Sequence, residues 1–466
     1  MSADNQLVAI STPLCVDKLL LRQAHITEEL GQPFSIDIEL LSDDEDISLD
    51  EILGQNVTIR LETEDESRFF NGIVTEFFQK ENIGRNACFG AVVKPWFWLL
   101  TLSETCRIFQ EKTYPDIIKA VFKDLGFSDF EDQLTGTYNP QEYVVQYNES
   151  DFNFVSRIME QEGIYYYFVH TNGKHSLVMA DDSSVQPDIG EVPFYEKEDR
   201  SYQVELEGIT KWENYRKIRT GGVSLGDFDF TTPSKNLSAV TKDPKTGALA
   251  SLQKFNYPGK YTERKDGTSY TKILMEKENV HYDQKYSEGN FRTLYAGSQF
   301  KLVDHHRDDQ NDSYLVVKFS CVLKSDQYIS TSSDSDADLY CCSFTSIPAK
   351  VTYRPQQIAT KPQISGPQTA IVVGKKGEEI WTDKYGRVKV LFHWDRDAKA
   401  DEKSSCWIRV SQTWAGKNWG SMQIPRIGQE VLVDFIHGDP DRPIIIGSVY
   451  NGSTMPPYDL PTNATM

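Results

Sequence analysis

Short apolar runs alternate with turn signals along residues 378–461, and this spacing constrains the fold more than any other feature of the chain. The runs are rich in Val, Ile, Phe and Trp, and they cover residues 388–394, 406–413, 431–436 and 443–450. They show no helical period, and Gly- or Pro-containing turns separate them. Evenly spaced short strands predict a small all-β barrel. With residues 421–424 as a short fifth strand, we predict an OB-type barrel.

The preceding part of the chain combines strands with a few helices. Residues 113–126 have a capping Thr113, an early Pro115 and a terminal Gly126 around one apolar face, which predicts a helix. Similar patterns predict helices at 150–162 and about 269–280, and a hairpin over 164–180. We therefore predict a mainly β chain with minor α content, of the α+β class. Residues 330–338 read as an acidic loop.

Both parts carry the same family resemblance. The barrel stretch contains TDKYGRVKVLFHWDRD, SSCWIRVSQTWAG and IPRIGQEVLVDFIHGDPDRPIIIGSVYNG. Earlier come CRIFQEKTYPDIIKAVFKDLGF, VVQYNESDFNFVSRIMEQEGIYYYF and FNYPGKY, in that order. These segments resemble VgrG proteins, the spikes of the type VI secretion machine, which are related to the hub and spike of contractile phage tails.

The resemblance implies an architecture and a set of partners. It implies a phage-hub-like pair of β-barrel domains followed by the OB-fold barrel, assembled as a homotrimer that caps an Hcp-like hexameric tube. It further implies effectors or adaptors, a PAAR-type tip protein, and contact with the target cell membrane on puncture. The work is mechanical, so the resemblance implies no enzyme activity, no catalytic or metal-binding residues and no cofactor.

Domain limits follow from the resemblance together with the prolines. Pro355, Pro362 and Pro367 raise the proline density, which predicts a stiff, extended linker. We predict a hub-like region at 1–360, this linker at 361–374, the OB-fold domain at 375–452, and the start of a C-terminal needle or neck at 453–466. Family members usually continue into a β-strand needle, so we expect either a truncated chain or a short variant, and binding of the tip protein needs the missing needle.

Charge and targeting signals narrow the classes of partner and location. The chain carries 69 acidic and 49 basic residues, a net charge of −20, which disfavours nucleic acid as a partner. The N-terminus has no basic segment followed by an apolar one, so we predict no signal peptide. We expect assembly in the cytoplasm and then secretion through the type VI apparatus. The seven cysteines form no C-x-x-C pair and are expected to be buried, reduced thiols.

Several patterns allow an enzymatic or binding interpretation beside a structural one. Residues 222–226 match G-x-S-x-G, but their flanks do not form the strand and helix of a nucleophile elbow, so we predict a loop. Residues 304–312, DHHRDDQND, resemble a metal cluster but lack zinc-like spacing, which favours a polar loop. His393 is expected to pack or hydrogen-bond at a strand end, and residues 439–443 to form a rigid turn braced by an Asp–Arg pair.

The tryptophans of the barrel have two interpretations. They could stack on bases or sugars, or they could be core and trimer-interface anchors, which the acidic composition favours. The four are Trp394, Trp407, Trp414 and Trp419. We therefore interpret the chain as a type VI spike component. The alternatives are the hub of a phage-like contractile tail and, from another class, a polysaccharide-binding or -cleaving protein.

Overall fold

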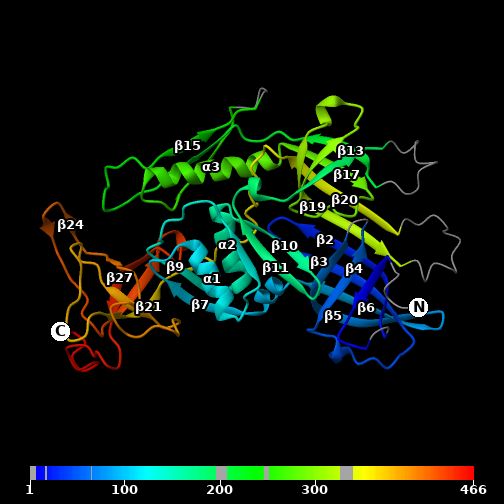
Figure 1. Cartoon of the computed structure of the whole chain (residues 1–466). Coiled ribbons are helices and arrows are strands. Elements are labelled where there is room, and N and C mark those ends of the chain that lie inside the picture. Colours follow the sequence, from blue (N-terminus) through cyan, green and yellow to red (C-terminus); the bar gives the residue numbers. More distant parts are fainter. Residues whose placement is uncertain are drawn as a thin grey trace. The chain divides into compact units, whose positions relative to one another are not determined.

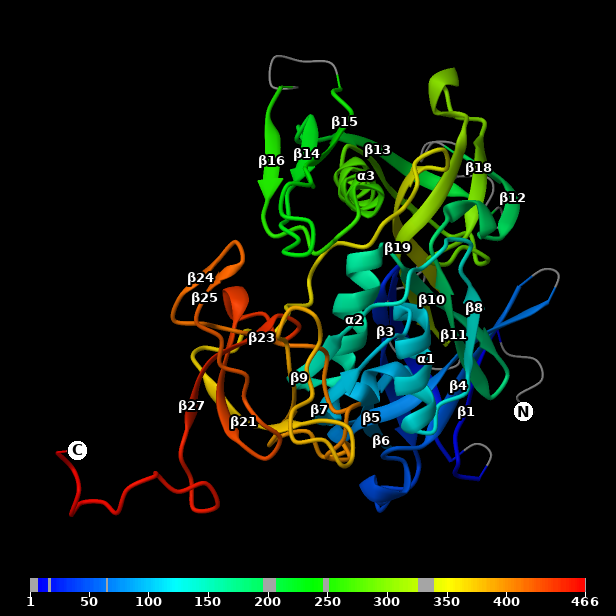
Figure 2. The same ribbon diagram turned by 90° about the vertical axis from the view of Figure 1, so that its left-hand side faces the viewer.

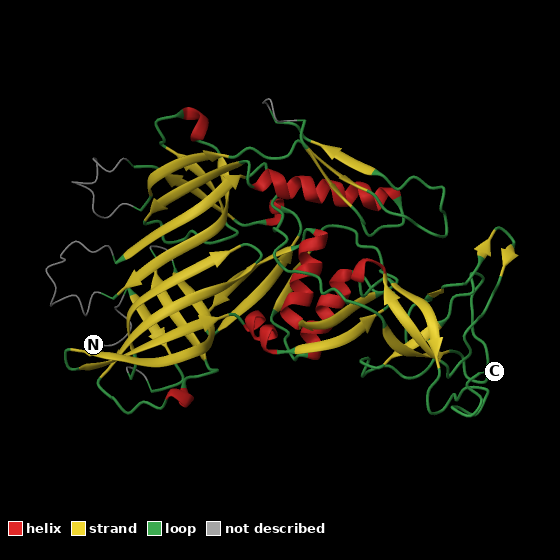
Figure 3. Cartoon of the chain, turned by 180° about the vertical axis from the view of Figure 1, so that it is seen from behind, coloured by secondary structure: helices red, strands yellow, loops and turns green. Residues whose placement is uncertain are grey.

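The computed structural model describes residues 7–15, 18–63, 66–195, 207–245, 251–325 and 339–465. The predicted acidic loop at 330–338 lies outside these residues. The described chain is mainly β with a small helical part, as predicted, and it forms two compact units (Figures 1 and 3). Unit 1 comprises residues 1–99, 127–136 and 159–357, and unit 2 comprises residues 100–126, 137–158 and 358–466.

Unit 1 is built on a large sheet in which two successive halves meet where β2 pairs with β19. The path of the sheet is β1-β4-β5-β6-β3-β2-β19-β20-β17-β13, and β18 pairs with both β12 and β19. The first half contains β1 (Val8–Ser11), β2 (Leu20–Glu29), β3 (Gln32–Ser42), β4 (Asn56–Glu62), β5 (Ser67–Ile83) and β6 (Asn86–Lys94). The second half contains β12 (Asp188–Pro193), β13 (Ile209–Arg216), β17 (Asp283–Gly289), β18 (Gln299–Val303), β19 (Ser313–Lys324) and β20 (Tyr340–Pro348).

Two three-stranded sheets complete unit 1. The predicted hairpin is confirmed, with Asn172 and Gly173 at its turn, and it forms a sheet in the order β10-β11-β8. Its strands are β8 (Phe130–Gln133), β10 (Tyr165–Thr171) and β11 (Lys174–Ala180). The other sheet has the order β15-β14-β16 and carries α3 (Arg264–Val280); its strands are β14 (Gly222–Leu225), β15 (Ala239–Lys242) and β16 (Gln253–Asn256).

Helix α3 begins earlier than the predicted residue 269. Its first turns include Gly267, a residue that weakens a helical pattern in the sequence. A Cβ atom at Gly267 would lie 2.4 Å from the ring of Tyr261. The glycine is therefore explained by close packing, which single-sequence reasoning could not reveal.

Unit 2 pairs two helices and a short ribbon with the barrel sheet. The ribbon joins β7 (Glu104–Phe109) to β9 (Val144–Ser150), and the helices are α1 (Tyr114–Asp124) and α2 (Asp151–Glu162). Both helix predictions are confirmed. The Thr113 side chain accepts a hydrogen bond from the amide of Asp116, and Gly126 follows the helix with φ at 84°.

The barrel sheet has the strand order β22-β21-β26-β27-β23, and a separate hairpin pairs β24 with β25. The bounds are β21 (Gln368–Val373), β22 (Lys389–Phe392), β23 (Arg409–Val410), β24 (Ala415–Gly416), β25 (Trp419–Gly420), β26 (Glu430–Phe435) and β27 (Pro443–Val449). Alternate residues face the core, such as Val388, Val390 and Phe392 on one edge and Val431 and Val433 opposite.

The prediction of a fifth strand at residues 421–424 is wrong. The fifth strand is β21, which pairs with both β22 and β26. It lies within residues 361–374, the predicted linker, so part of that stretch belongs to the sheet. Residues 421–424 instead run along the side chain of Gln412, which exchanges two hydrogen bonds of 2.8 and 3.1 Å with the backbone of Gln423. The Gln412 side chain therefore makes the hydrogen bonds that a neighbouring strand would make in a sheet.

Candidate functional site

The most exposed aromatic feature of the barrel is the tryptophan hairpin, residues 414–420. Asn418 takes a positive φ of 61° at its turn, and the Trp414 and Trp419 rings meet edge to face with centroids 5.3 Å apart. These side chains remain 65% and 57% exposed. A Cβ atom at Gly416 would lie 2.3 Å from the Trp419 ring, so this position requires glycine. The fold presents two large apolar rings to solvent, the composition of an interface anchor.

The other two tryptophans are held within unit 2. The indole N–H of Trp394 donates to Oε1 of Gln368 at 2.9 Å, and its ring stacks on Phe392 with centroids 5.0 Å apart. Trp407 stacks on Trp381 at 6.2 Å. Both are half-buried. The four sequence candidates therefore divide into two that support the barrel and two that are available to a partner.

A cation from outside the predicted Asp–Arg pair braces the turn after β26. Lys361 forms ion pairs with both Asp439, at 2.5 Å, and Asp441. Oδ1 of Asp441 also accepts a hydrogen bond from the amide of Val145 at 2.7 Å. The Arg442 amide donates to the Asp439 carbonyl, which closes the turn at 2.9 Å. The sequence located the rigid turn but not the distant lysine.

A buried polar network fixes the start of α2 to the β7–β9 ribbon. The carboxylate of Asp151 is fully buried and pairs with Arg107, while it accepts hydrogen bonds from Gln146 at 2.9 Å and Ser103 at 2.5 Å. Further along α2, the Arg157 guanidinium contacts the carboxylate of the buried Glu149 at distances of 2.7 to 3.1 Å. Such pairs stabilise only when geometry satisfies every polar atom, which these contacts do for Asp151.

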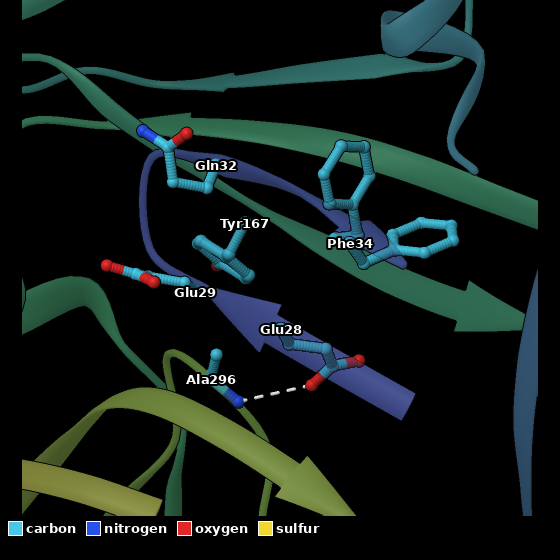
Figure 4. A pocket seen from close by; sticks show the side chains of 7 residues that line it. Glu28, Glu29, Gln32, Phe34, Tyr167 and Ala296 are labelled. Atoms are coloured by element: carbon cyan, nitrogen blue, oxygen red, sulfur yellow. Dashed lines mark hydrogen bonds between the residues drawn. The ribbon is translucent and has the colours of Figure 1, made fainter. Parts of the chain in front are cut away.

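In unit 1 a second polar cluster resembles a catalytic constellation more than any sequence candidate does. Burial opposes ionisation of Glu28, but the His170 ring, whose Nε2 lies 3.5 Å from the carboxylate, and the charge of Arg68 hold the pKa of Glu28 below the ordinary value. The Ala296 amide donates to Glu28 at 3.3 Å (Figure 4). The cavity beside Glu28, Phe34 and Tyr167 has a volume of about 10 Å³, room for about one water molecule. It is too small for a substrate.

The same cluster continues to a second histidine. His175 lies opposite His170 in the β10–β11 register and is 5% exposed. Its Nδ1–H donates a hydrogen bond to Oδ1 of Asn71 at 2.8 Å. Its Nε2 accepts the Trp96 amide hydrogen at 2.9 Å, which fixes the neutral tautomer. Burial and the neighbouring His170 lower the pKa of His175 to about 3. Sequence reasoning missed this pair, although two histidines placed symmetrically around Asn172-Gly173 were a visible signal.

The structure places the motifs that suggested catalysis or metal binding in a strand and in a cluster of stacked rings. Residues 222–225 form β14 and not the predicted loop, and the hydroxyl of Ser224 donates to the Lys254 carbonyl at 3.3 Å. His305 stacks on His306 with centroids 4.3 Å apart, and its ring also packs against Phe194 at 4.6 Å. No group of three or more His, Cys, Asp or Glu side chains within the described residues could hold a metal ion.

His393 and the cysteines complete the sequence candidates. Nε2 of His393 lies 3.0 Å from the hydroxyl of Thr369 at the end of β22, so the predicted hydrogen bond at a strand end is confirmed. The expectation of buried thiols is wrong for Cys15 and Cys341, which are exposed. Cys88, Cys321 and Cys342 are buried. Among the described residues, no helix combines the length and apolar character needed to cross a membrane.

Family models match both parts of the chain. Residues 27–327 match the phage tail baseplate hub (GPD) family, and residues 369–450 match the type VI secretion system/phage-baseplate injector OB domain. Two spike proteins of the type VI secretion system from Pseudomonas aeruginosa are similar over nearly the whole chain. VgrG1b is 45% identical over 100% of this chain, and VgrG1a is 44% identical over 99%. The chain spans 63% of VgrG1b and 72% of VgrG1a.

A solved structure has the same fold over almost the whole chain. It is the c3393 protein of E. coli, described as a component of the type VI secretion system with structural similarity to the T4 bacteriophage tail proteins gp27 and gp5. The TM-score is 0.69 at 20% identity, with 94% of this chain and 99% of c3393 covered. The fold of this chain is therefore shared with a protein of distant sequence.

Proposed function

Because the chain belongs to the VgrG family of type VI secretion system spike proteins, we propose that it forms the hub and barrel of such a spike. One observation carries the proposal: a single chain joins a phage-hub match at 27–327 to an injector OB-domain match at 369–450. The proposed role is to form a rigid assembly and not to catalyse a reaction. Three copies form a ring that caps an Hcp-like hexameric tube.

The further partners follow from this role. The ring carries effectors or adaptors, and a PAAR-type tip protein completes it above a needle. The assembly forms in the cytoplasm, leaves through the type VI apparatus without a signal peptide, and punctures the target cell membrane. The buried network of Asp151 and Arg107 supports a mechanical role, because it connects α2 rigidly to the ribbon β7–β9 within unit 2.

Two measurements test this function. The purified chain is expected to have about three times its 53.2 kDa mass by light scattering in solution. Deletion of its gene in the native bacterium is expected to stop release of the tube protein into the medium. A chain that remains monomeric at micromolar concentration, in a strain whose tube protein is still released without it, contradicts the proposal.

The exposed tryptophan hairpin gives a specific prediction for self-association. Replacing Trp414 and Trp419 together by alanine removes two rings that are 65% and 57% exposed in the single chain. If the hairpin lies between copies, the double variant is expected to weaken trimer formation by about a hundredfold, because buried tryptophans are typical interface hot spots. Sedimentation at decreasing concentration measures the dissociation.

A matched control separates this effect from a general loss of exposed aromatics. Tyr215 is 50% exposed on β13 of unit 1, and Tyr215→Ala is expected to leave the trimer unchanged. If the double variant of Trp414 and Trp419 associates as tightly as the unmodified chain, then the tryptophan hairpin does not lie in the interface between copies.

Two other functions remain as alternatives. The hub of a phage-like contractile tail shares the matching hub family, but the 44–45% identity to type VI spike proteins favours secretion. Neighbouring genes for a tail tape measure, in place of secretion ATPases, identify the phage alternative. The exposed Trp414 and Trp419 rings are also suited to stacking on sugars. Binding of peptidoglycan that the double variant loses, with trimer formation intact, supports the polysaccharide alternative.

A further inference from the structure

Among the residues that the structure describes, helix α3 covers one face of the small sheet β14–β16 of unit 1. Helix α3 packs on it through Tyr270 and Leu274, which contact a buried cluster around Leu225 and Ala239. Figure 2 shows α3 along one side of the three strands. A three-stranded sheet with a helix on one side is half of a layered α/β arrangement, so the chemistry of the second face decides what it can bind.

The second face carries an apolar row. In the register of the sheet, Ser224 of the central strand lies between Val240 of β15 and Phe255 of β16, so these three side chains point the same way. The neighbouring Val223 and Leu225 are buried toward α3, which places the row on the opposite face. Val240 is 48% exposed and Phe255 is 66% exposed.

The central strand carries no large side chain on this face, because its outward positions are Gly222, Ser224 and Gly226. A Cβ atom at Gly222 would lie 3.3 Å from the Gln253 side chain and 3.4 Å from that of Lys242. At Gly226 it would lie 3.5 Å from the ring of Phe255. A strip of small residues therefore runs between the side chains of the two flanking strands, and we call this strip the trough. The G-x-S-x-G pattern is explained as the floor of this trough.

The lobe around the trough is basic in an acidic protein. Residues 216–280 contain 12 Lys and Arg against 7 Asp and Glu, whereas the whole chain has a net charge of −20. Some of these charges pair within the lobe, as Asp243 does with Arg219 and Glu278 with Lys254, and each such pair leaves the excess of basic residues unchanged. Lys242 stands on the rim of the trough and has no ion-pair partner among the described residues.

We propose that this outward face binds an acidic amphipathic helix of a partner protein. The apolar stripe of the helix lies in the trough against Val240 and Phe255, and its carboxylates face Lys242 and the surrounding basic lobe. The missing side chains of the central strand allow the close approach that sheet–helix packing requires. Nucleic acid fits less well, because the exposed apolar side chains of Val240 and Phe255 offer no contacts to phosphates. The surface is complete in one copy and does not require the spike assembly.

A pair of designed peptides tests the proposal on the full chain. Both are capped helices of about 18 residues with leucine on one face, and they differ only in having glutamate or lysine on the other. We expect the glutamate peptide to bind about tenfold or more tightly than the lysine peptide in fluorescence anisotropy, with weaker binding at high salt. Phe255→Ala is expected to weaken it about tenfold, and Lys242→Glu is expected to reverse the preference between the peptides.

The same peptide-binding assay includes a control variant. Phe78→Ala removes a ring that is 41% exposed on β5, and it is expected to leave the peptide affinity unchanged. Hydrogen exchange is expected to slow in β14–β16 when the glutamate peptide binds. Absence of saturable binding, equal affinity for the two peptides, or competition by a DNA duplex that Phe255→Ala does not affect overturns the proposal.

Discussion

Replacing Asp151 by alanine is expected to lower the free energy of unfolding of unit 2 by about 3–5 kcal/mol. The carboxylate is fully buried, and its loss leaves the Arg107 guanidinium, which is 15% exposed, without its close anionic partner. The buried Gln146 amide, 2.9 Å from Asp151, also loses one of its two acceptors and keeps the carbonyl oxygen of Glu149 at 3.2 Å. Urea denaturation followed by tryptophan fluorescence measures the change, and hydrogen exchange in α2 locates it.

The chain supplies its own control for this prediction. Asp124 contacts the same arginine at 3.5 Å, but its side chain is 63% exposed. Asp124→Ala is therefore expected to cost less than about 1 kcal/mol, because exposed ion pairs contribute little. Asp151→Asn keeps the shape of the side chain and is expected to fall between the two. Equal effects of Asp151→Ala and Asp124→Ala show that the buried network does not hold α2 in place.

The elements that the sequence predicted well are those with local causes. Helix α1 has its capping Thr113, its early Pro115 and its apolar face within a few residues of one another, and the structure reproduces each. The barrel strands likewise follow from alternation, because Val431 and Val433 face the core while the residues between them do not. The resemblance to VgrG proteins required the order of long segments, and the family comparisons confirm it.

The sequence predictions that the structure corrects depend on contacts between residues that are not neighbours in the chain. The brace of the turn at Asp439 comes from Lys361, and the backbone at residue 423 is held by Gln412, so no local pattern shows either contact. The glycines of the G-x-S-x-G pattern show most clearly how a local pattern can mislead. Gly222 and Gly226 were interpreted as loop residues, yet they lie in and beside a strand, where the side chains of the neighbouring strands approach them closely.

Acid is expected to destabilise unit 1 through His175. In the folded chain burial and His170 lower the pKa of His175 to about 3 from an ordinary 6.5, so the unfolded chain binds this proton first. The stability that the neutral ring contributes is complete above pH 6.5 and is lost as the pH falls toward 3. At 1.36 kcal/mol per unit of pKa, the loss is about 3 kcal/mol by pH 4 and about 4 kcal/mol by pH 3, where half of the folded chains also bind the proton.

The difference between two pH profiles isolates this contribution from that of the carboxylates. His175→Gln cannot take up the proton, and its amide oxygen can still accept the Trp96 amide hydrogen that Nε2 accepts at 2.9 Å. We expect it to be less stable than the unmodified chain at pH 7, with a stability that falls less steeply toward pH 4. His25→Gln, at an exposed ring that contacts Ser320, is expected to keep the original profile. If His175→Gln retains the full slope, then the proton that destabilises the fold binds elsewhere. The contacts of Asn71 with both histidines would then serve packing alone.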